Sequence, residues 1–231
     1  MIEYWLQAAS TYAGDIDFVI ELVAVIVGFW FFLTVGIFFW LIFAHRVSRS
    51  PRAEYLTGDE EQPKKFITWA HMLVLVCDVF IVWAAVQVWY EVKQELPLEN
   101  GGQPQVVRVI SQQWAWSFVH PGADGVLDTA DDIRSVDELH IEVNRLYHYE
   151  LSSKDVLHSF SVPVFRLKQD AIPGRVIRGW FEATQTGSYD IQCAEICGIG
   201  HALMPARIVI ETPEQHAAWL AGHSPTQLAA R

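Results

Sequence analysis

The chain has 231 residues, of which 52% are hydrophobic, and its formal net charge at pH 7 is −11. It contains only three cysteines, which excludes a zinc or iron–sulfur site built from four cysteines. With this excess of acidic side chains, no nucleic-acid partner is expected.

Two long apolar runs in the first hundred residues predict membrane helices. Residues 18–43 contain a single charged side chain, Glu21, and residues 66–90 contain a single acid, Asp78. About 20 apolar residues span a bilayer as a helix, so both runs are long enough. We therefore expect a transmembrane hairpin over residues 18–92.

The charges around these runs predict their orientation. The intervening loop at 44–65 carries the basic side chains Arg46, Arg49, Arg52, Lys64 and Lys65. The first 17 residues, a short outer N-terminus, carry acids but no Lys or Arg. The positive-inside rule places the loop in the cytoplasm. Both termini then face outward, so the expected location is a bacterial inner membrane with the C-terminal domain in the periplasm.

The rest of the chain has the pattern of a β domain. Residues 93–104 are rich in Pro and Gly and predict a linker, followed by one domain at 105–231. Short strand-like runs lie at 106–110, 114–119, 138–143, 147–151, 176–183, 187–193 and 207–211. Such runs separated by turn residues predict a β-sandwich or barrel. Thr212, Pro213 and Gln215 then predict a capped helix that ends at about residue 220.

One loop of this domain is unusually acidic. Asp124, Asp128, Asp131 and Asp132 lie close together in a stretch that also contains Gly. Carboxylate oxygens can bind calcium, but the spacing is not that of an EF-hand loop. A solvated turn is the favoured interpretation.

The most informative stretch follows the run at 187–193. Cys193, Cys197, His201 and Met204 lie within twelve residues, and His158 offers a second imidazole upstream. Soft sulfur donors select copper(I), zinc or iron–sulfur, and a Cys/His set with a weak axial Met is typical of copper electron-transfer sites. The pattern therefore predicts a copper site, provided that folding brings His158 to the loop.

This stretch has two possible interpretations. Two thiolates shared between two coppers, with His158 and His201 on one copper each, use every strong donor. Met204 and the backbone carbonyl of Glu195 then fit as weak axial ligands. A disulfide, or two buried thiols, would leave the spacing of His201 and Met204 without a purpose. We expect Ile196, Ile199, Leu203 and Pro205 to exclude water from the site.

These residues resemble subunit II of the haem-copper oxidases, cytochrome c oxidase subunit 2, with its binuclear copper A centre. The resemblance also includes residues 113–118, 155–160 and 168–175, in the family's order. It implies a cupredoxin-like domain. The expected fold is thus a two-helix transmembrane hairpin followed by an all-β cupredoxin-like Greek-key barrel.

The resemblance also implies a function for the chain within a complex. It would accept electrons from cytochrome c, or a cytochrome c domain, at the copper pair and pass them to haem in subunit I, which reduces oxygen to water. Trp114 matches the family's exposed tryptophan through which cytochrome c donates its electron. The alternative interpretation is that Trp114 and Trp116 are both core aromatics on the same face of a strand. In the family the Glu195 carboxylate also helps to bind magnesium at the boundary with subunit I.

The net charge of the C-terminal domain indicates what kind of electron donor it would attract. Residues 101–231 carry 15 acidic and 10 basic side chains. An acidic face would steer a basic cytochrome domain. The alternative interpretation, that the acidic surface only aids solubility, is equally well supported by the sequence.

Other functions and roles stay open. Many proton-pumping members have a Glu before a Trp in the second helix, but aligning on Trp69 places Phe66 or Lys65 there. This departure keeps a copper A type nitric oxide reductase as an alternative. A membrane-tethered copper chaperone with C-x3-C would need alternating β and α segments. Asp78, with His71 on the same helix face, predicts a polar contact between helices, pairing with subunit I or a proton relay.

Overall fold

This computed structural model describes residues 6–46, 57, 61–98 and 104–224. The chain divides into two compact units. One is Asp17–Tyr90, and the other joins Met1–Ile16 to Glu91–Arg231. The segment before the first helix therefore belongs with the C-terminal domain rather than with the hairpin.

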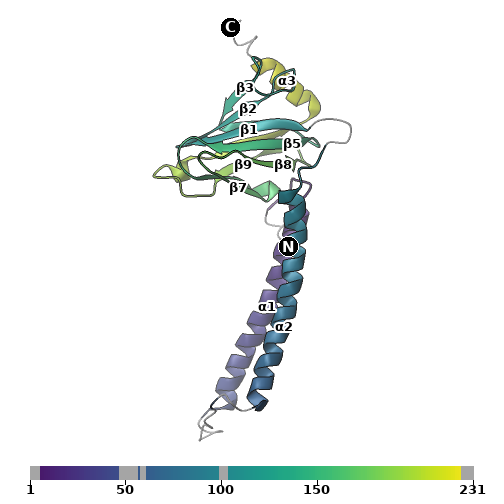
Figure 1. Cartoon of the computed structure of the whole chain (residues 1–231), viewed down its shortest axis with the longest axis vertical. Helices are drawn as coiled ribbons and strands as arrows, with labels where there is room; N and C mark the ends of the chain where they lie inside the picture. The colour runs from purple at the N-terminus through teal and green to yellow at the C-terminus, as the bar shows by residue number, and fades with distance from the viewer. Residues whose placement is uncertain (1–5, 47–56, 58–60, 99–103, 225–231) are drawn as a thin grey trace. The chain divides into compact units, whose positions relative to one another are not determined.

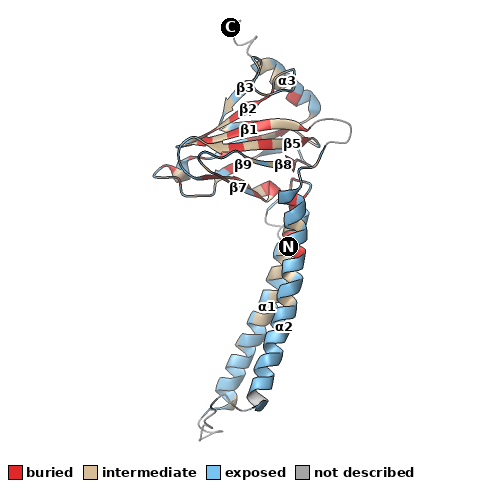
Figure 2. Ribbon diagram, in the orientation of Figure 1, coloured by how far each residue is buried: buried red, intermediate tan, exposed pale blue. Residues whose placement is uncertain are grey.

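Two helices make up the first unit. α1 (Ala13–Ala44) and α2 (Glu61–Trp89) lie side by side (Figure 1) and are long and apolar enough to cross a membrane. Most of their side chains are exposed (Figure 2), as expected for apolar surfaces that face lipid rather than a protein core. α2 ends in the π-helical turn η2 (Tyr90–Gln94). The predicted loop at 44–65 falls mostly outside the described residues.

The second unit is built from two five-stranded sheets. The first contains β1 (Gln105–Gln112), β2 (Ala115–His120), β3 (Ile133–Val136), β5 (Leu146–Ser153) and β8 (Ile177–Glu182), in the order β3-β2-β1-β5-β8. The second contains β4 (Glu138–Glu142), β6 (His158–Val162), β7 (Leu167–Ala171), β9 (Gly187–Cys193) and β10 (Ala206–Glu211), in the order β4-β10-β9-β6-β7.

Strands that are neighbours in space are often distant in sequence. β1 pairs with β2 in antiparallel fashion and with β5 in parallel, and β10 pairs with β9 and β4 in the same two ways. Each sheet therefore combines hairpins with long crossovers. The predicted helical hairpin followed by an all-β domain is confirmed.

Three strands were not predicted from the sequence. β3 is short and contains Arg134, β6 contains His158 with two serines, and β7 includes Lys168 and Asp170. Such polar runs have weak intrinsic strand preference, and pairing with neighbouring strands stabilises them instead. This matters for the site, because β6 carries one of the expected ligands.

Aromatic side chains fill the space between the sheets. Phe181 stacks on Tyr147 and Tyr149, with ring centroids 5.8 and 6.0 Å apart. Trp116 meets Phe160 edge to face at 5.5 Å, and both are fully buried. The buried positions alternate along the strands, as two-sheet packing requires (Figure 2).

Short helices complete the domain. η3 (Pro163–Phe165) and η4 (His201–Leu203) are single 3-10 turns in loops. α3 (Pro213–His223) begins with the predicted capping box, in which Thr212 and Gln215 exchange hydrogen bonds of 3.0 and 3.3 Å. It extends three residues beyond the predicted end.

Candidate metal centre

The expected ligands converge where β6 and β9 run side by side. Phe160 pairs with Cys193, so the start of β6 lies beside the end of β9. His158 is the first residue of β6 and is completely buried. Cys197, η4 and Met204 follow in the loop between β9 and β10. Strand pairing thus supplies the residue that is distant in sequence, and the loop supplies the others.

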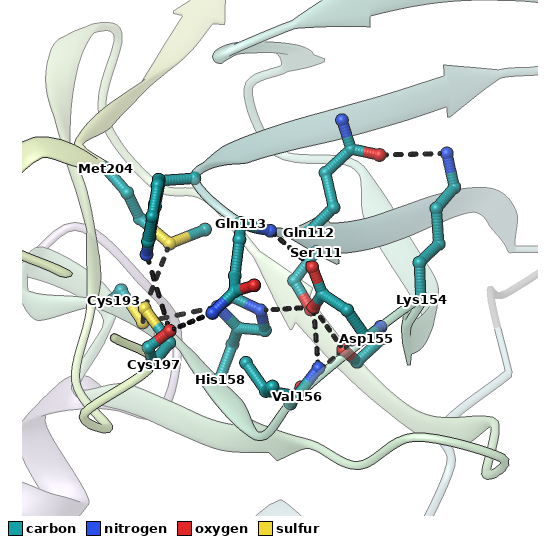
Figure 3. A network of polar contacts seen from close by, with 12 residues as sticks. Ser111, Gln112, Gln113, Lys154, Asp155, Val156, His158, Cys193, Cys197 and Met204 are labelled. Carbon is teal, nitrogen blue, oxygen red and sulfur yellow. Dashed lines mark hydrogen bonds and ion pairs between the residues drawn. The ribbon is translucent and has the colours of Figure 1, made fainter. Parts of the chain in front are cut away.

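The donor atoms approach one another closely (Figure 3). The Sγ atoms of Cys193 and Cys197 are 3.8 Å apart. His158 Nδ1 lies 3.9 Å from Cys193 Sγ, and His201 Nδ1 lies 3.6 Å from Cys197 Sγ. Met204 Sδ is 3.6 Å from Cys197 Sγ. Each thiol therefore has its own imidazole, with the thioether on the Cys197 side.

A backbone carbonyl completes the set. The Cys193 thiol donates to the carbonyl oxygen of Glu195 over 3.2 Å. All six sequence-predicted ligands are therefore together in one place. Two soft thiol sulfurs, two imidazole nitrogens, a thioether and a carbonyl form a donor set that fits copper. Among the described residues, His158, Cys193 and Cys197 also form a group whose ligand atoms lie within 4.8 Å of one another.

Asp155 fixes the orientation of the His158 ring, a role that the sequence did not predict. His158 Nε2 lies 2.9 Å from Asp155 Oδ1, and because a carboxylate accepts, this nitrogen carries the proton. The lone pair of Nδ1 then faces Cys193. Asp155 Oδ2 accepts from the Gln113 N–H (Figure 3). Burial opposes the charged form, but the hydrogen bonds from Gln113 and His158 outweigh it and lower the pKa of Asp155.

The thiol of Cys197 is hard to deprotonate. Burial, and next the hydrogen bond and charge of Cys193, raise the pKa of Cys197 to about 11. The neutral thiol is therefore favoured at pH 7 unless a cation binds. Because copper binds thiolates, binding would release protons and pair the charges that burial otherwise disfavours.

Gln113 and Trp116 hold the ligand loop from the other sheet. Gln113 Nε2 donates to the Cys197 carbonyl over 2.8 Å. Trp116 Nε1 donates to the Met204 carbonyl over 3.2 Å, and its ring contacts the His158 ring edge to face. A D-x-x-H spacing at 155–158 was visible in the sequence, but nothing local indicated that Gln113 or Trp116 faces the loop.

Comparison with known proteins identifies the domain. Residues 105–212 match the family described as cytochrome c oxidase subunit II, periplasmic domain. The alternative cytochrome c oxidase subunit 2 of Bradyrhizobium diazoefficiens is 29% identical over 94% of this chain and 83% of its own length. Residues 105–212 therefore contain the periplasmic domain of the subunit II family. The matched family and this relative are named as subunits of cytochrome c oxidase, an oxidoreductase complex.

Two other proteins show the extent of the likeness. Cytochrome c oxidase subunit 2 of Thermostichus vulcanus is 44% identical, over 49% of this chain and 32% of its own length. The periplasmic domain of subunit II of cytochrome oxidase (CoxB) of Bradyrhizobium japonicum is 28% identical, with a TM-score of 0.46 over 52% of this chain and 92% of that domain. The matched family implies a copper A centre and a periplasmic domain, and the two candidate membrane helices indicate a membrane anchor.

Trp114 does not share a strand face with Trp116 in this subunit II domain. It precedes β2, where the alternation of a strand does not apply, and it is 38% exposed, whereas Trp116 is completely buried. Its indole nitrogen donates to the Cys197 carbonyl over 3.3 Å. Gly200 lies so close to the ring that an added Cβ would come within 2.4 Å of it.

The prediction of a water-excluding apolar shell is wrong. Ile196, Ile199 and Leu203 are 80, 95 and 80% exposed, and Pro205 is exposed as well. They lie on the outer side of a loop whose inner side carries the ligands. The core aromatics Trp116 and Phe160 cover the site from within instead.

The acidic loop is a turn held by its own side chains. Asp131 and Asp132 accept from backbone N–H groups of Asp124 and Asp128, at 3.2 and 3.0 Å. Asp128 also forms a two-bond ion pair with Arg108. These contacts fit the favoured interpretation, a solvated turn.

Proposed function

We propose that this subunit II chain accepts electrons for a respiratory haem-copper terminal oxidase. The observation that supports the proposal is the convergence of six donor groups from the strands β6 and β9 and from the loop that follows β9. Copper bound there would supply one-electron chemistry. The proposed ligands are His158, Cys193, Glu195 through its carbonyl, Cys197, His201 and Met204.

The surrounding residues hold these donors in place. Asp155 sets the His158 tautomer, Gln113 holds the Cys197 carbonyl, and Trp116 holds the Met204 backbone. Trp116 is a buried strand residue, and Gln113 and Asp155 stand in short turns next to β1, β2, β5 and β6, so the donors have little freedom to relax. A rigid ligand set is what electron transfer requires, because geometry then changes little between oxidation states.

Cytochrome c, or a cytochrome c domain, is the proposed electron donor. Trp114 supports this, since its half-exposed ring reaches the surface while its nitrogen contacts the ligand loop. The exposed side chains of Ile196, Ile199 and Leu203 stand on that loop and form an apolar rim. Apolar contact would hold the donor, and the acidic balance of the domain would steer a basic one.

Beyond the copper pair, the proposed acceptor is haem in subunit I, where oxygen becomes water. The Glu195 carboxylate is proposed to share a magnesium ion with that subunit. The proposed topology has two membrane passes, with both termini and the copper domain on the periplasmic side. The names of the relatives favour oxygen over nitric oxide as terminal acceptor.

The test uses the whole complex, purified through a C-terminal tag on the full chain. Copper content and absorption are measured, together with oxygen and nitric oxide consumption driven by reduced cytochrome c. We expect a copper pair and rapid oxygen uptake. Cys197→Ser should lose the copper absorption and the oxidase activity, whereas the control Cys77→Ser, in α2, should keep both.

The same preparation tests the role of Trp114. Trp114→Phe should keep the copper absorption and slow electron uptake from cytochrome c. An unchanged rate would reject that role alone. Rapid nitric oxide turnover with little oxygen uptake would replace the oxidase proposal by the reductase alternative.

A further inference from the structure

The ring of Trp114 lies against a part of the ligand loop that consists of glycines. Gly200 is buried, and a Cβ added to it would stand 2.7 Å from Cγ and 2.8 Å from Cε3 of the indole, and closer still to Cδ2. A Cβ added to Gly198 would stand 3.3 Å from Cζ2 of the same ring. Carbon atoms in contact normally lie about 3.5 to 4.0 Å apart. The indole therefore occupies the space that a side chain at position 200 would need.

The path of the backbone does not explain why residue 200 is a glycine. Gly200 has φ −91° and ψ 11°. These are the angles of the third residue of a type I turn, which most residues can adopt. Gly198 differs, because its φ of +121° lies in a region that favours glycine. The missing side chain at position 200 thus serves the close approach of the ring.

This close approach brings the indole to the backbone of a proposed copper ligand. Trp114 Nε1 donates to the carbonyl oxygen of Cys197 over 3.3 Å, and the same oxygen accepts from Gln113 Nε2 over 2.8 Å. Gly200 directly precedes the turn η4, which begins with His201. The ring therefore meets the ligand loop at one proposed ligand and next to another, while Trp114 stays 38% exposed to a donor.

We propose that Gly200 is a positioning residue for electron entry: its missing side chain lets the Trp114 ring pack on the ligand loop, with its N–H on the Cys197 carbonyl. The inference rests on the proposed function, since it requires that electrons enter through Trp114. A methyl group at position 200 pushes the ring toward solvent, because the loop backbone occupies the other side. Electron transfer slows steeply with distance, so a ring displaced from the loop passes electrons more slowly.

The first measurement reads the position of the ring without copper and without turnover. The copper-free full chain is exposed to hydroxyl radicals, and labelling of Trp114 is followed by mass spectrometry. Wild type is compared with Gly200→Ala and with the control Gly222→Ala in α3, where no described atom stands within 4 Å of an added Cβ. Gly200→Ala should label Trp114 about twice as fast, since a residue that is 38% exposed turns outward. Gly222→Ala should match wild type.

The second measurement uses the whole complex with copper. Gly200→Ala should keep the copper absorption, because Gln113 and Trp116 still hold the loop from the other sheet. Its electron uptake from reduced cytochrome c should slow by about 10- to 100-fold, since a misplacement of about 1 Å can cost the larger factor. The slowing should appear in the maximal rate rather than in KM, because the exposed apolar side chains of the loop are unchanged.

A double-mutant cycle tests whether Gly200 acts through Trp114. Trp114→Ala removes the ring and should slow electron uptake by itself. Adding Gly200→Ala to Trp114→Ala should cause no further slowing, because no ring is left to displace. An equal slowing in both backgrounds would overturn the proposal. So would unchanged labelling of Trp114 in Gly200→Ala, or a loss of its copper absorption, which would show that the loop moves instead of the ring.

Failure of this inference is distinct from failure of the proposed function. A wild-type complex without a copper pair, or a Trp114→Ala variant with unchanged electron uptake, would contradict the proposed route of electron entry and this inference with it. A normal wild type and a slow Trp114→Ala variant, together with a Gly200→Ala variant that labels and turns over like wild type, would contradict only the role of Gly200.

Discussion

At the scale of single residues, Asp155 shows how an outer group controls a metal ligand. Its Oδ1 accepts from His158, while its other oxygen and the neighbouring backbone keep the carboxylate in place. Without this contact the imidazole could present a protonated Nδ1 to the copper site. Such supporting groups set ligand basicity and tautomer together.

Asp155→Asn should therefore lower copper affinity about 10- to 100-fold. The amide can either donate or accept, so it no longer forces the proton onto Nε2 of His158. Affinity is measured on the full chain by competition with a chelator of known strength. The control is Asp190→Asn. It alters an exposed carboxylate on β9 that forms an ion pair with Arg207 on β10. Equal affinities in the two variants would contradict the role assigned to Asp155.

At the scale of elements, α3 is fastened to the domain by a cluster of histidines around Trp219. The Trp219 ring stacks on His140 at 4.2 Å and meets His120 at 4.9 Å. His140 and His216 share Glu211, at 3.1 and 3.0 Å. Burial, and next the proximity of His216 and His140, lower the pKa of His120 to about 3. The cluster therefore favours a neutral His120.

Lowering the pH should destabilise the packing of α3 against the domain. An exposed histidine takes up a proton near pH 6.5, whereas folded His120 resists it down to about pH 3. The stability contributed by neutral His120 is thus present above about pH 6.5 and decreases below it, by about 1 kcal/mol per pH unit. Burial also lowers the pKa of His216, which adds in the same direction.

Hydrogen exchange of the α3 amides, corrected for intrinsic rates, measures this effect. Between pH 7 and pH 5.5 the opening of α3 should increase by up to about tenfold in the wild type. His120→Gln removes one titrating group and should show a smaller pH dependence. The same dependence in both proteins would show that His120 does not carry the effect.

At the scale of the whole molecule, the segment before α1 is bound by hydrogen bonds to the C-terminal domain, which is distant in sequence. We call residues 6–12 the N-terminal strap. Ala9 exchanges backbone hydrogen bonds with Val164 and Thr184, at 2.8 and 2.9 Å, and Ser10 forms a bridge with Ala183. Arg166 donates to backbone carbonyls of the strap as well. Ala9 is fully buried.

Ala9→Asp should release the strap, because an unpaired buried carboxylate costs several kcal/mol. Cleavage of the strap by a protease in the full-length chain should accelerate more than about tenfold, since about 1.4 kcal/mol is a factor of ten. Ala8→Asp, at a half-buried neighbour, is the matched control. Copper absorption should survive, because the strap meets the domain near the start of β9 and the ligands lie at its end. Equal cleavage in both variants would contradict this role.

The sequence alone determined the features that depend on local pattern. Two apolar runs were long enough for membrane helices whatever surrounds them, and the alternating runs required an all-β domain. The four ligand side chains from Cys193 to Met204 were readable because they lie within twelve residues of one another. Thr212 and Gln215 specified a helix start through their own hydrogen bonds.

Only the tertiary structure decided what depends on distant segments. β6 is a strand because β7 and β9 pair with it, and that pairing brings His158 to the cysteines. Gln113 and Trp116 hold the ligand loop across sequence separations of more than eighty residues. The strap, the histidine cluster and the outward side chains of the ligand loop likewise follow from packing. A sequence pattern reports which face a residue prefers locally, whereas its contacts depend on which segment the fold places opposite.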